Sequence, residues 1–201
     1  MVIVIDLGIS NLSSVTNALD YLNSEYIISN SCMDIDRSSH VILPGVGTFE
    51  SGMKALRSHD LIECLQRNVI NLNKPLLGIC LGMHLLFSSS EESPGSEGLS
   101  FVSGHVEKLK KSSEYSIPRI GWCPSEFKKD FLCFKQGENI DFYYIHSYHV
   151  VPTNIDTITM LSGDLNPVVS GIQEGSIHAV QFHPEKSHHA GIQLLKSFLE
   201  V

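Results

Sequence analysis

The 201-residue chain has few of the features that mark nucleic-acid-binding or membrane proteins. It carries 14 Lys and Arg residues against 22 Asp and Glu residues, a formal net charge of −8, and its basic residues form no long run. A surface that binds phosphates needs clustered basic side chains, so nucleic-acid binding is not expected. No apolar stretch is long enough to span a bilayer. The first six residues lack the basic start of a signal peptide, and we therefore expect a cytoplasmic chain.

Cysteine is scarce as well. Five Cys residues stand at positions 32, 64, 80, 123 and 133, and no two of them form a C-x-x-C pair. An odd number without that spacing argues against a disulfide framework and against a structural zinc site. We therefore expect reduced thiols, no metal and no other cofactor.

The apolar residues predict an α/β fold in one domain over residues 1–201. Short continuous apolar runs at 2–5, 26–28, 41–43 and 76–79 are typical of buried strands. Residues 11–22, 61–72 and 188–199, and the stretch from 80 to 87, have helical spacing instead. Strands that alternate with helices indicate a mostly parallel central sheet flanked by helices on both faces.

The second half of the chain has a different pattern. Residues 88–100 are rich in Ser, Glu, Gly and Pro, which predicts an exposed loop. Short β-like runs follow near 101–106, 142–145, 157–161 and 177–181, separated by glycines and prolines. These runs favour an antiparallel β extension, formed together with the last strand of the central sheet.

A candidate nucleophile, Cys80, stands in Gly78-Ile79-Cys80-Leu81-Gly82, between a predicted strand and a predicted helix. This is the nucleophile-elbow pattern G-x-S-x-G with cysteine in place of serine. The flanking glycines relieve crowding at a sharp turn, and the helix N-terminus below favours the reactive thiolate. The alternative is a buried, inert cysteine after a core strand.

A candidate base and its orienting carboxylate follow another apolar run, in His183-Pro184-Glu185. Side chains two residues apart in an extended chain point to the same side, and Pro184 is expected to keep the backbone extended. A carboxylate beside an imidazole fixes its tautomer and stabilises its charged form, as a Cys–His pair requires. A surface loop with a solvated His and Glu is the alternative.

An oxyanion site is predicted where Pro44-Gly45-Val46-Gly47 ends a strand. A peptide N–H near Val46 or Gly47, together with that of Leu81, is placed to hold the oxygen of a tetrahedral intermediate. An ordinary turn is the alternative.

Taken together, these segments resemble the class I glutamine amidotransferases, and among them the glutaminase subunits of imidazole glycerol phosphate synthase. The resemblance covers the whole chain, and further segments that carry it are His146-Ser147-Tyr148, Arg119 to Trp122 and Gln181 to Ser187. It implies that Cys80 attacks the carboxamide of glutamine, that His183 transfers protons and that Glu185 holds His183. It also implies that His146, Ser147 and Tyr148 contact the bound glutamine.

The resemblance further implies a partner. Subunits of this kind form a heterodimer with a (β/α)8-barrel cyclase, which uses the ammonia to make imidazole glycerol phosphate and an aminoimidazole carboxamide ribotide in histidine biosynthesis. Four residues correspond to the docking face: Asn11, Trp122, Tyr143 and Lys186. Their alternative roles are a helix cap, a core aromatic, a strand residue and a solvated lysine.

Three positions depart from the family pattern. His84 stands where a substrate-contacting glutamine is usual; one helical turn after Cys80, it is expected to contact glutamine weakly or indirectly. Cys123-Pro124 replaces an asparagine after Trp122, and Ser10 replaces a common glycine. These changes leave open a paralogue that feeds another synthase, such as a surface-sugar amidotransferase. A stand-alone hydrolase of the γ-glutamyl hydrolase kind and a subunit that has lost catalysis are further alternatives.

Overall fold

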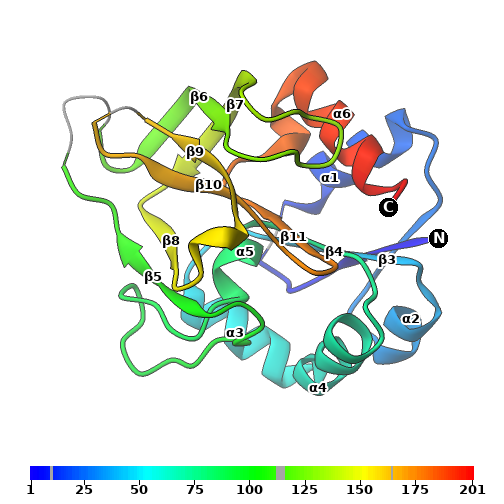
Figure 1. Cartoon of the computed structure of the whole chain (residues 1–201). Helices are drawn as coiled ribbons and strands as arrows, with labels where there is room; N and C mark the ends of the chain where they lie inside the picture. Colours follow the sequence, from blue (N-terminus) through cyan, green and yellow to red (C-terminus); the bar gives the residue numbers. More distant parts are fainter. Residues whose placement is uncertain (10, 112–115, 164) are drawn as a thin grey trace.

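A nine-stranded sheet forms the centre of the computed structural model, which describes residues 1–9, 11–111, 116–163 and 165–201 (Figure 1). Ser10, one of the departures from the family pattern, lies outside these residues. The strand order is β2-β1-β3-β4-β11-β10-β9-β6-β7, and β5 and β8 form a separate antiparallel pair. The strands are β1 (Val2–Ile5), β2 (Tyr26–Ser29), β3 (His40–Gly45), β4 (Leu76–Cys80), β5 (Gly104–Lys108), β6 (Arg119–Phe127), β7 (Asn139–His146), β8 (Tyr148–Pro152), β9 (Ile158–Ser162), β10 (Val168–Glu174) and β11 (Ile177–Val180).

The first half of the sheet is parallel and the second half is antiparallel. β1, β2, β3, β4 and β11 pair in parallel, whereas β10, β9, β6 and β7 continue the sheet in antiparallel fashion. The predicted fold class, a mostly parallel sheet with an antiparallel extension, is confirmed. β11 belongs to both halves because it pairs in parallel with β4 and antiparallel with β10.

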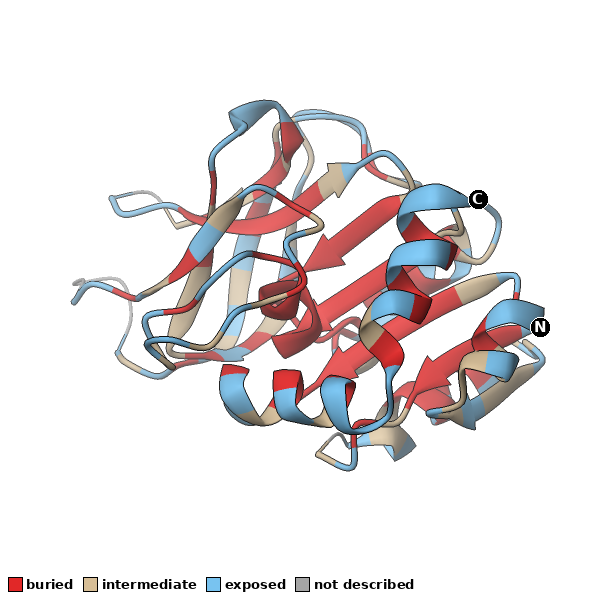
Figure 2. Ribbon diagram, turned by 90° about the horizontal axis from the view of Figure 1, so that it is seen from below, coloured by how far each residue is buried: buried red, intermediate tan, exposed pale blue. Residues whose placement is uncertain are grey.

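Helices cover both faces of the parallel half. α1 (Leu12–Tyr21) and α6 (His188–Phe198) pack on one face. α2 (Cys32–Arg37), α3 (Phe49–Ser58), α4 (Leu61–Leu65) and α5 (Leu81–Leu85) pack on the other. Figure 2 shows the strands buried between these layers. Within β1, Val2 and Val4 face one layer while Ile3 and Ile5 face the other, which explains its uninterrupted apolar run.

Most predicted elements are found, with several differences. The predicted helix over 61–72 begins as α4 and continues as a π-helical segment, Gln66–Asn71. The helices α2 and α3 and the strands β6, β8 and β10 were not predicted. Among the described residues, no helix has the length and apolar character needed to cross a membrane.

The loop over 88–100 is not simply exposed, and this prediction is corrected. Ser90 and Leu99 are buried. The Glu92 carboxylate accepts a hydrogen bond from the Phe49 N–H at 2.7 Å, at the start of α3. The loop therefore folds back onto the protein and satisfies a backbone donor that a helix start leaves unpaired.

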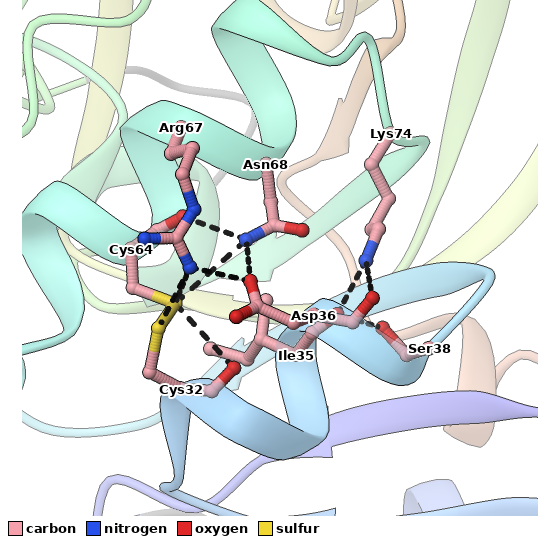
Figure 3. A network of polar contacts seen from close by, with 8 residues as sticks. All are labelled: Cys32, Ile35, Asp36, Ser38, Cys64, Arg67, Asn68 and Lys74. Atoms are coloured by element: carbon pink, nitrogen blue, oxygen red, sulfur yellow. Dashed lines mark hydrogen bonds and ion pairs between the residues drawn. A yellow bond between two sulfur atoms is a disulfide. The ribbon is translucent and has the colours of Figure 1, made fainter.

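The expectation of reduced thiols is wrong for two cysteines. Cys32 in α2 and Cys64 in α4 form a disulfide, with their Cα atoms 5.8 Å apart (Figure 3). The two helices are neighbours in space although 32 positions separate the cysteines. Arg67 lies over the bond, 3.3 Å from the Cys32 sulfur, and its guanidinium binds the Asp36 carboxylate at 2.5 Å.

The same place holds a group of potential metal ligands. Cys32, Asp36 and Cys64 have ligand atoms within 4.8 Å of one another. In the structure, however, both sulfurs are used in the disulfide and are not thiolates. Hydrogen bonds from Asn68 and Arg67 lower the pKa of Asp36, so this carboxylate already has cationic and amide partners.

Candidate active site

Cys80 stands at a sharp turn between β4 and α5. Its φ of 53° and ψ of −107° are strained for a residue with a side chain. A Cβ on Gly82 would lie 1.7 Å from the Leu43 carbonyl oxygen, so only glycine lets α5 approach β3 this closely. A Cβ on Gly78 would lie 3.1 Å from the backbone of Gly82. The elbow predicted from the two glycines is therefore present.

His183 and Glu185 form a buried pair. The Nδ1 of His183 lies 2.8 Å from Oε1 of Glu185, and the two side chains are only 3% and 5% exposed. The predicted contact is present, but the predicted extended backbone is not. Pro184–Lys186 forms a 3₁₀ turn, closed by the Lys186 N–H and the Ser187 hydroxyl, which both donate to the His183 carbonyl. Proline suits the first position of such a turn as well as it suits an extended chain.

The electrostatics of His183 link it to Cys80. Its Nε2 is buried and has no hydrogen bond of normal geometry among the described residues. Burial by itself lowers the pKa of His183, but the nearby Cys80 sulfur and the Glu185 carboxylate outweigh burial and raise this pKa to about 10. The imidazole is therefore protonated at neutral pH, and a positive charge lies beside the Cys80 sulfur.

A cavity of about 280 Å³ opens beside Cys80. β3 pairs with β4 so that Gly45 is opposite Cys80, which brings the turn after β3 to the cavity. All the residues predicted to bind substrate line it: Val46, Gly47, Leu81, His84, His146, Ser147 and Tyr148. Glu92, Pro118 and Ile145 also line it and were not predicted. Glu92 gave no signal in the sequence, because it reaches the cavity only through the folding of its loop.

Two histidines of the cavity are buried and neutral. Burial lowers the pKa of His84 to about 4 and that of His146 to about 3. The Nδ1 of His146 donates to the Tyr148 carbonyl at 2.8 Å. The Nε2 of His84 lies 2.8 Å from Oε1 of Gln181, a buried residue that sequence reasoning did not assign to the site. Its place two positions before His183 does not reveal this contact, which depends on the pairing of β11 with β4.

Comparison with known proteins agrees with this geometry. The family described as "Glutamine amidotransferase class-I" matches residues 3–201. A relative from Methanococcus maripaludis, named imidazole glycerol phosphate synthase subunit HisH 2, is 40% identical over 201 residues, which is 100% of this chain and 99% of that protein. The chain belongs to the class I glutamine amidotransferase family.

Two further likenesses support the family and the fold of this amidotransferase. The imidazole glycerol phosphate synthase subunit HisH of Bacillus cereus is 42% identical over 203 residues, covering 100% of this chain and 95% of the relative. A crystal structure of a glutamine amidotransferase has a TM-score of 0.79 at 18% identity, over 100% of this chain and 98% of the other. The second likeness concerns the fold alone.

The residues predicted to face a partner lie on one side of the amidotransferase. Trp122 is 46% exposed and packs edge-on against Tyr143, with ring centroids 6.0 Å apart. Its other contact is a stacked His188 ring at 4.8 Å, which was not predicted. Asn11 and Lys186 are exposed and lie close to His183 and Glu185, around a small shared cavity.

The structure bears on the alternative roles of Asn11 and Trp122, a helix cap and a core aromatic. Asn11 stands at the N-cap position of α1, but its side chain makes no capping hydrogen bond. The partly exposed Trp122 is not a core aromatic. Cys123 and Pro124, the departure next to it, lie within β6 opposite Phe142 and Asp141 of β7.

Proposed function

We propose that this amidotransferase is the glutaminase subunit of an imidazole glycerol phosphate synthase, hydrolysing L-glutamine to glutamate and ammonia. The observation that carries the proposal is the strained Cys80 at the edge of a small cavity, beside the buried His183–Glu185 pair. A cysteine next to a charged, oriented imidazole is the arrangement that nucleophilic catalysis on an amide requires.

The reaction begins with attack by the Cys80 thiolate on the carboxamide carbon of glutamine. As the C–S bond forms, the carbonyl electron pair moves onto oxygen, and the N–H groups of Leu81 and of Val46 or Gly47 stabilise that oxyanion. The protonated His183 gives its proton to the amide nitrogen, the C–N bond breaks and ammonia leaves. A glutamyl thioester on Cys80 remains.

Water completes the cycle. Neutral His183 accepts a proton from water as the water oxygen attacks the thioester carbon, and the C–S bond then breaks to release glutamate and the thiolate. Glu185 holds His183 in the orientation for both steps and stabilises its charged form. Of the remaining cavity residues, His146, Ser147 and Tyr148 are proposed to position the glutamine, whereas His84 acts on it only indirectly.

The proposed partner is a (β/α)8-barrel cyclase that receives the ammonia and makes imidazole glycerol phosphate and an aminoimidazole carboxamide ribotide. Support comes from the relatives, both named as synthase subunits, and from a group near the catalytic pair in which Asn11, Trp122 and Lys186 are exposed and Tyr143 is half-buried. The paralogue feeding a different synthase is not favoured by these relatives. We further propose that residues 1–201 act as one domain. We also propose a cytoplasmic location, which cell fractionation would test.

The test is glutamate release from glutamine by the purified chain, alone and with the cyclase of the same organism, each with and without the ribonucleotide ligand of the cyclase. We expect strong stimulation by cyclase plus ligand, and none with Cys80→Ala. Trp122→Ala should lower the stimulation by weakening docking while Cys80 still reacts with a glutamine-like electrophile. Absence of stimulation in the intact chain would overturn the assignment to this synthase.

A further inference from the structure

The further inference concerns His84, and it rests on the proposed function because it deepens the account of the same site. We infer that His84 is a positioning residue, which holds the carboxamide of Gln181 so that its N–H group donates to the Cys80 sulfur. His84 thus acts on the nucleophile, Cys80, through Gln181 and not through the substrate.

The contacts form a continuous chain. His84 Nε2 lies 2.8 Å from Gln181 Oε1, and Gln181 Nε2 lies 3.9 Å from Cys80 Sγ. The second distance is long but lies within the range of hydrogen bonds to sulfur, and hydrogen bonds in empty active sites often shorten when substrate binds. All three side chains are buried, with Gln181 fully so.

The backbone brings these residues together. β11 pairs with β4 so that Val180 is opposite Ile79, and one step further along both chains Gln181 comes beside Cys80. His84 lies one helical turn after Cys80 in α5, on the same face of the helix. The contact therefore bridges the segment that carries the nucleophile and the segment that carries His183.

The direction of each hydrogen bond follows from charge. A thiolate accepts hydrogen bonds and repels a carbonyl oxygen, so the Gln181 amide must turn its N–H group to the sulfur and its oxygen to His84. The imidazole must then carry its proton on Nε2. Burial lowers the pKa of His84 to about 4, and a neutral ring with one N–H is the form that this arrangement needs.

The titratable groups near His84 and Cys80 are compatible with a neutral His84 that orients Gln181. His146 and His149 face His84, and burial lowers the pKa of each, so they add little positive charge at neutral pH. His149 is also held by Glu107 at 3.2 Å. The protonated His183 also interacts with the sulfur. The Gln181 amide is thus a second, uncharged donor to the thiolate, and it depends on His84 for its orientation.

The alternative is a purely structural role, in which His84 fills space in the core and its bond to Gln181 has no effect on Cys80. The two roles differ in what they predict for the reactivity of the thiolate. A hydrogen bond to a charged group is worth roughly a 10- to 100-fold change in such an equilibrium. Loss of packing alone lowers stability without moving the pH dependence of the thiol.

The experiment is the rate of Cys80 alkylation by iodoacetamide between pH 5 and 10, followed by peptide mass spectrometry in the full chain. His84→Phe keeps a ring without a donor, and Gln181→Met removes the amide. Each should move the midpoint of the pH profile upward and slow alkylation at pH 7 by about 10-fold or more. The double variant should be no slower than either single variant, because both break one chain of contacts.

Rescue provides the decisive comparison. The amide nitrogen of a glutamine reaches about as far along the side chain as Nε2 of histidine, so His84→Gln should restore the profile to within about threefold, whereas His84→Asn should not. His105→Phe, on the exposed side of β5, is the matched control for a histidine-to-phenylalanine change. Cys133, an exposed thiol, is the internal control for reagent and folding.

The outcomes separate the two proposals. If Cys80 of the unaltered chain reacts no faster than Cys133, the proposed nucleophile fails. If Cys80 is reactive but the profiles of His84→Phe and Gln181→Met coincide with the original, only the inference about His84 is overturned. A changed profile for Gln181→Met with an unchanged one for His84→Phe would also overturn it.

Discussion

Replacing Gly82 with alanine tests how closely the reactivity of Cys80 depends on the contact between α5 and β3. The added Cβ would lie 1.7 Å from the Leu43 carbonyl oxygen, and ordinary contact begins at 3.4 Å. The obstacle is strand backbone, which does not yield as a flexible side chain does. The start of α5 must therefore retreat by about 1.7 Å, because a close-packed interior offers no free space.

Two effects of this retreat are expected. Overpacking should lower the free energy of unfolding by about 1–3 kcal/mol. Cys80 immediately precedes α5 and should move with it, and a misplacement of about 1 Å at a reacting atom lowers a rate roughly 100-fold. The expected result of Gly82→Ala is a folded, weakened protein whose Cys80 reacts about 100-fold more slowly.

Urea unfolding and iodoacetamide trapping of Cys80 measure these two quantities in the isolated chain. Gly137→Ala is the matched control, since Gly137 has a φ of 89° and no atom within 4 Å of an added Cβ. It should cost about 1–2 kcal/mol in backbone strain and leave Cys80 unaffected. Gly78→Ala, with its nearest contacts at 3.1 Å, should give a smaller effect of the same kind.

The reasoning is refuted if Gly82→Ala reacts at the original rate, or if Gly137→Ala slows the trapping of Cys80 to the same degree. The second result would mean that any loss of stability lowers the reactivity of Cys80, and that this reactivity does not depend specifically on the contact between α5 and β3.

Three other results are expected. Glu185→Gln removes the charge beside His183 and lowers the pKa of this histidine, so trapping of the nucleophile at pH 7 should slow roughly 10- to 100-fold, and an unchanged rate would contradict the thiolate–imidazolium pair. Burial lowers the pKa of His146 from 6.5 to about 3. Between these two pH values His146 is protonated in the unfolded chain but not in the folded chain. The contribution of His146 to stability should therefore be complete above pH 6.5 and decline by about 1.4 kcal/mol per pH unit between pH 6.5 and 3, and His146→Asn should flatten the dependence of Tm on pH in this range. Reducing the Cys32–Cys64 disulfide should lower the free energy of unfolding by roughly 3–4 kcal/mol, as the double Cys→Ser variant should do without reductant; equal urea midpoints would contradict this.

Much of the fold was predictable because the relevant signals are local. An apolar run such as 2–5 belongs to a strand buried on both faces, and the spacing over 11–22 belongs to α1. The elbow at Cys80 was predictable for the same reason, since two glycines four residues apart report the crowding at one turn. His183 and Glu185 were correctly paired, although a 3₁₀ turn and not an extended chain brings them together.

The features that were missed depend on contacts between distant segments. Gln181 meets Cys80 only because β11 pairs with β4 in one particular register, and residue types do not reveal that register. Cys32 and Cys64 meet because α2 and α4 pack side by side. The spacing of the cysteines in the sequence does not predict this packing. His188 joins Trp122 through the packing of α6 beside the sheet.

The disulfide turns part of the chain into a closed covalent ring. Between its two cysteines lie β3, the turn at 44–47 and α3, and β3 runs between β1 and β4 in the sheet. A protease that cuts once within this ring, for example at the 39% exposed Val46, therefore does not divide the molecule. Apart from the one water molecule added by hydrolysis, the nicked protein keeps its mass, so it should migrate as one species in denaturing gels and separate into two fragments only after reduction.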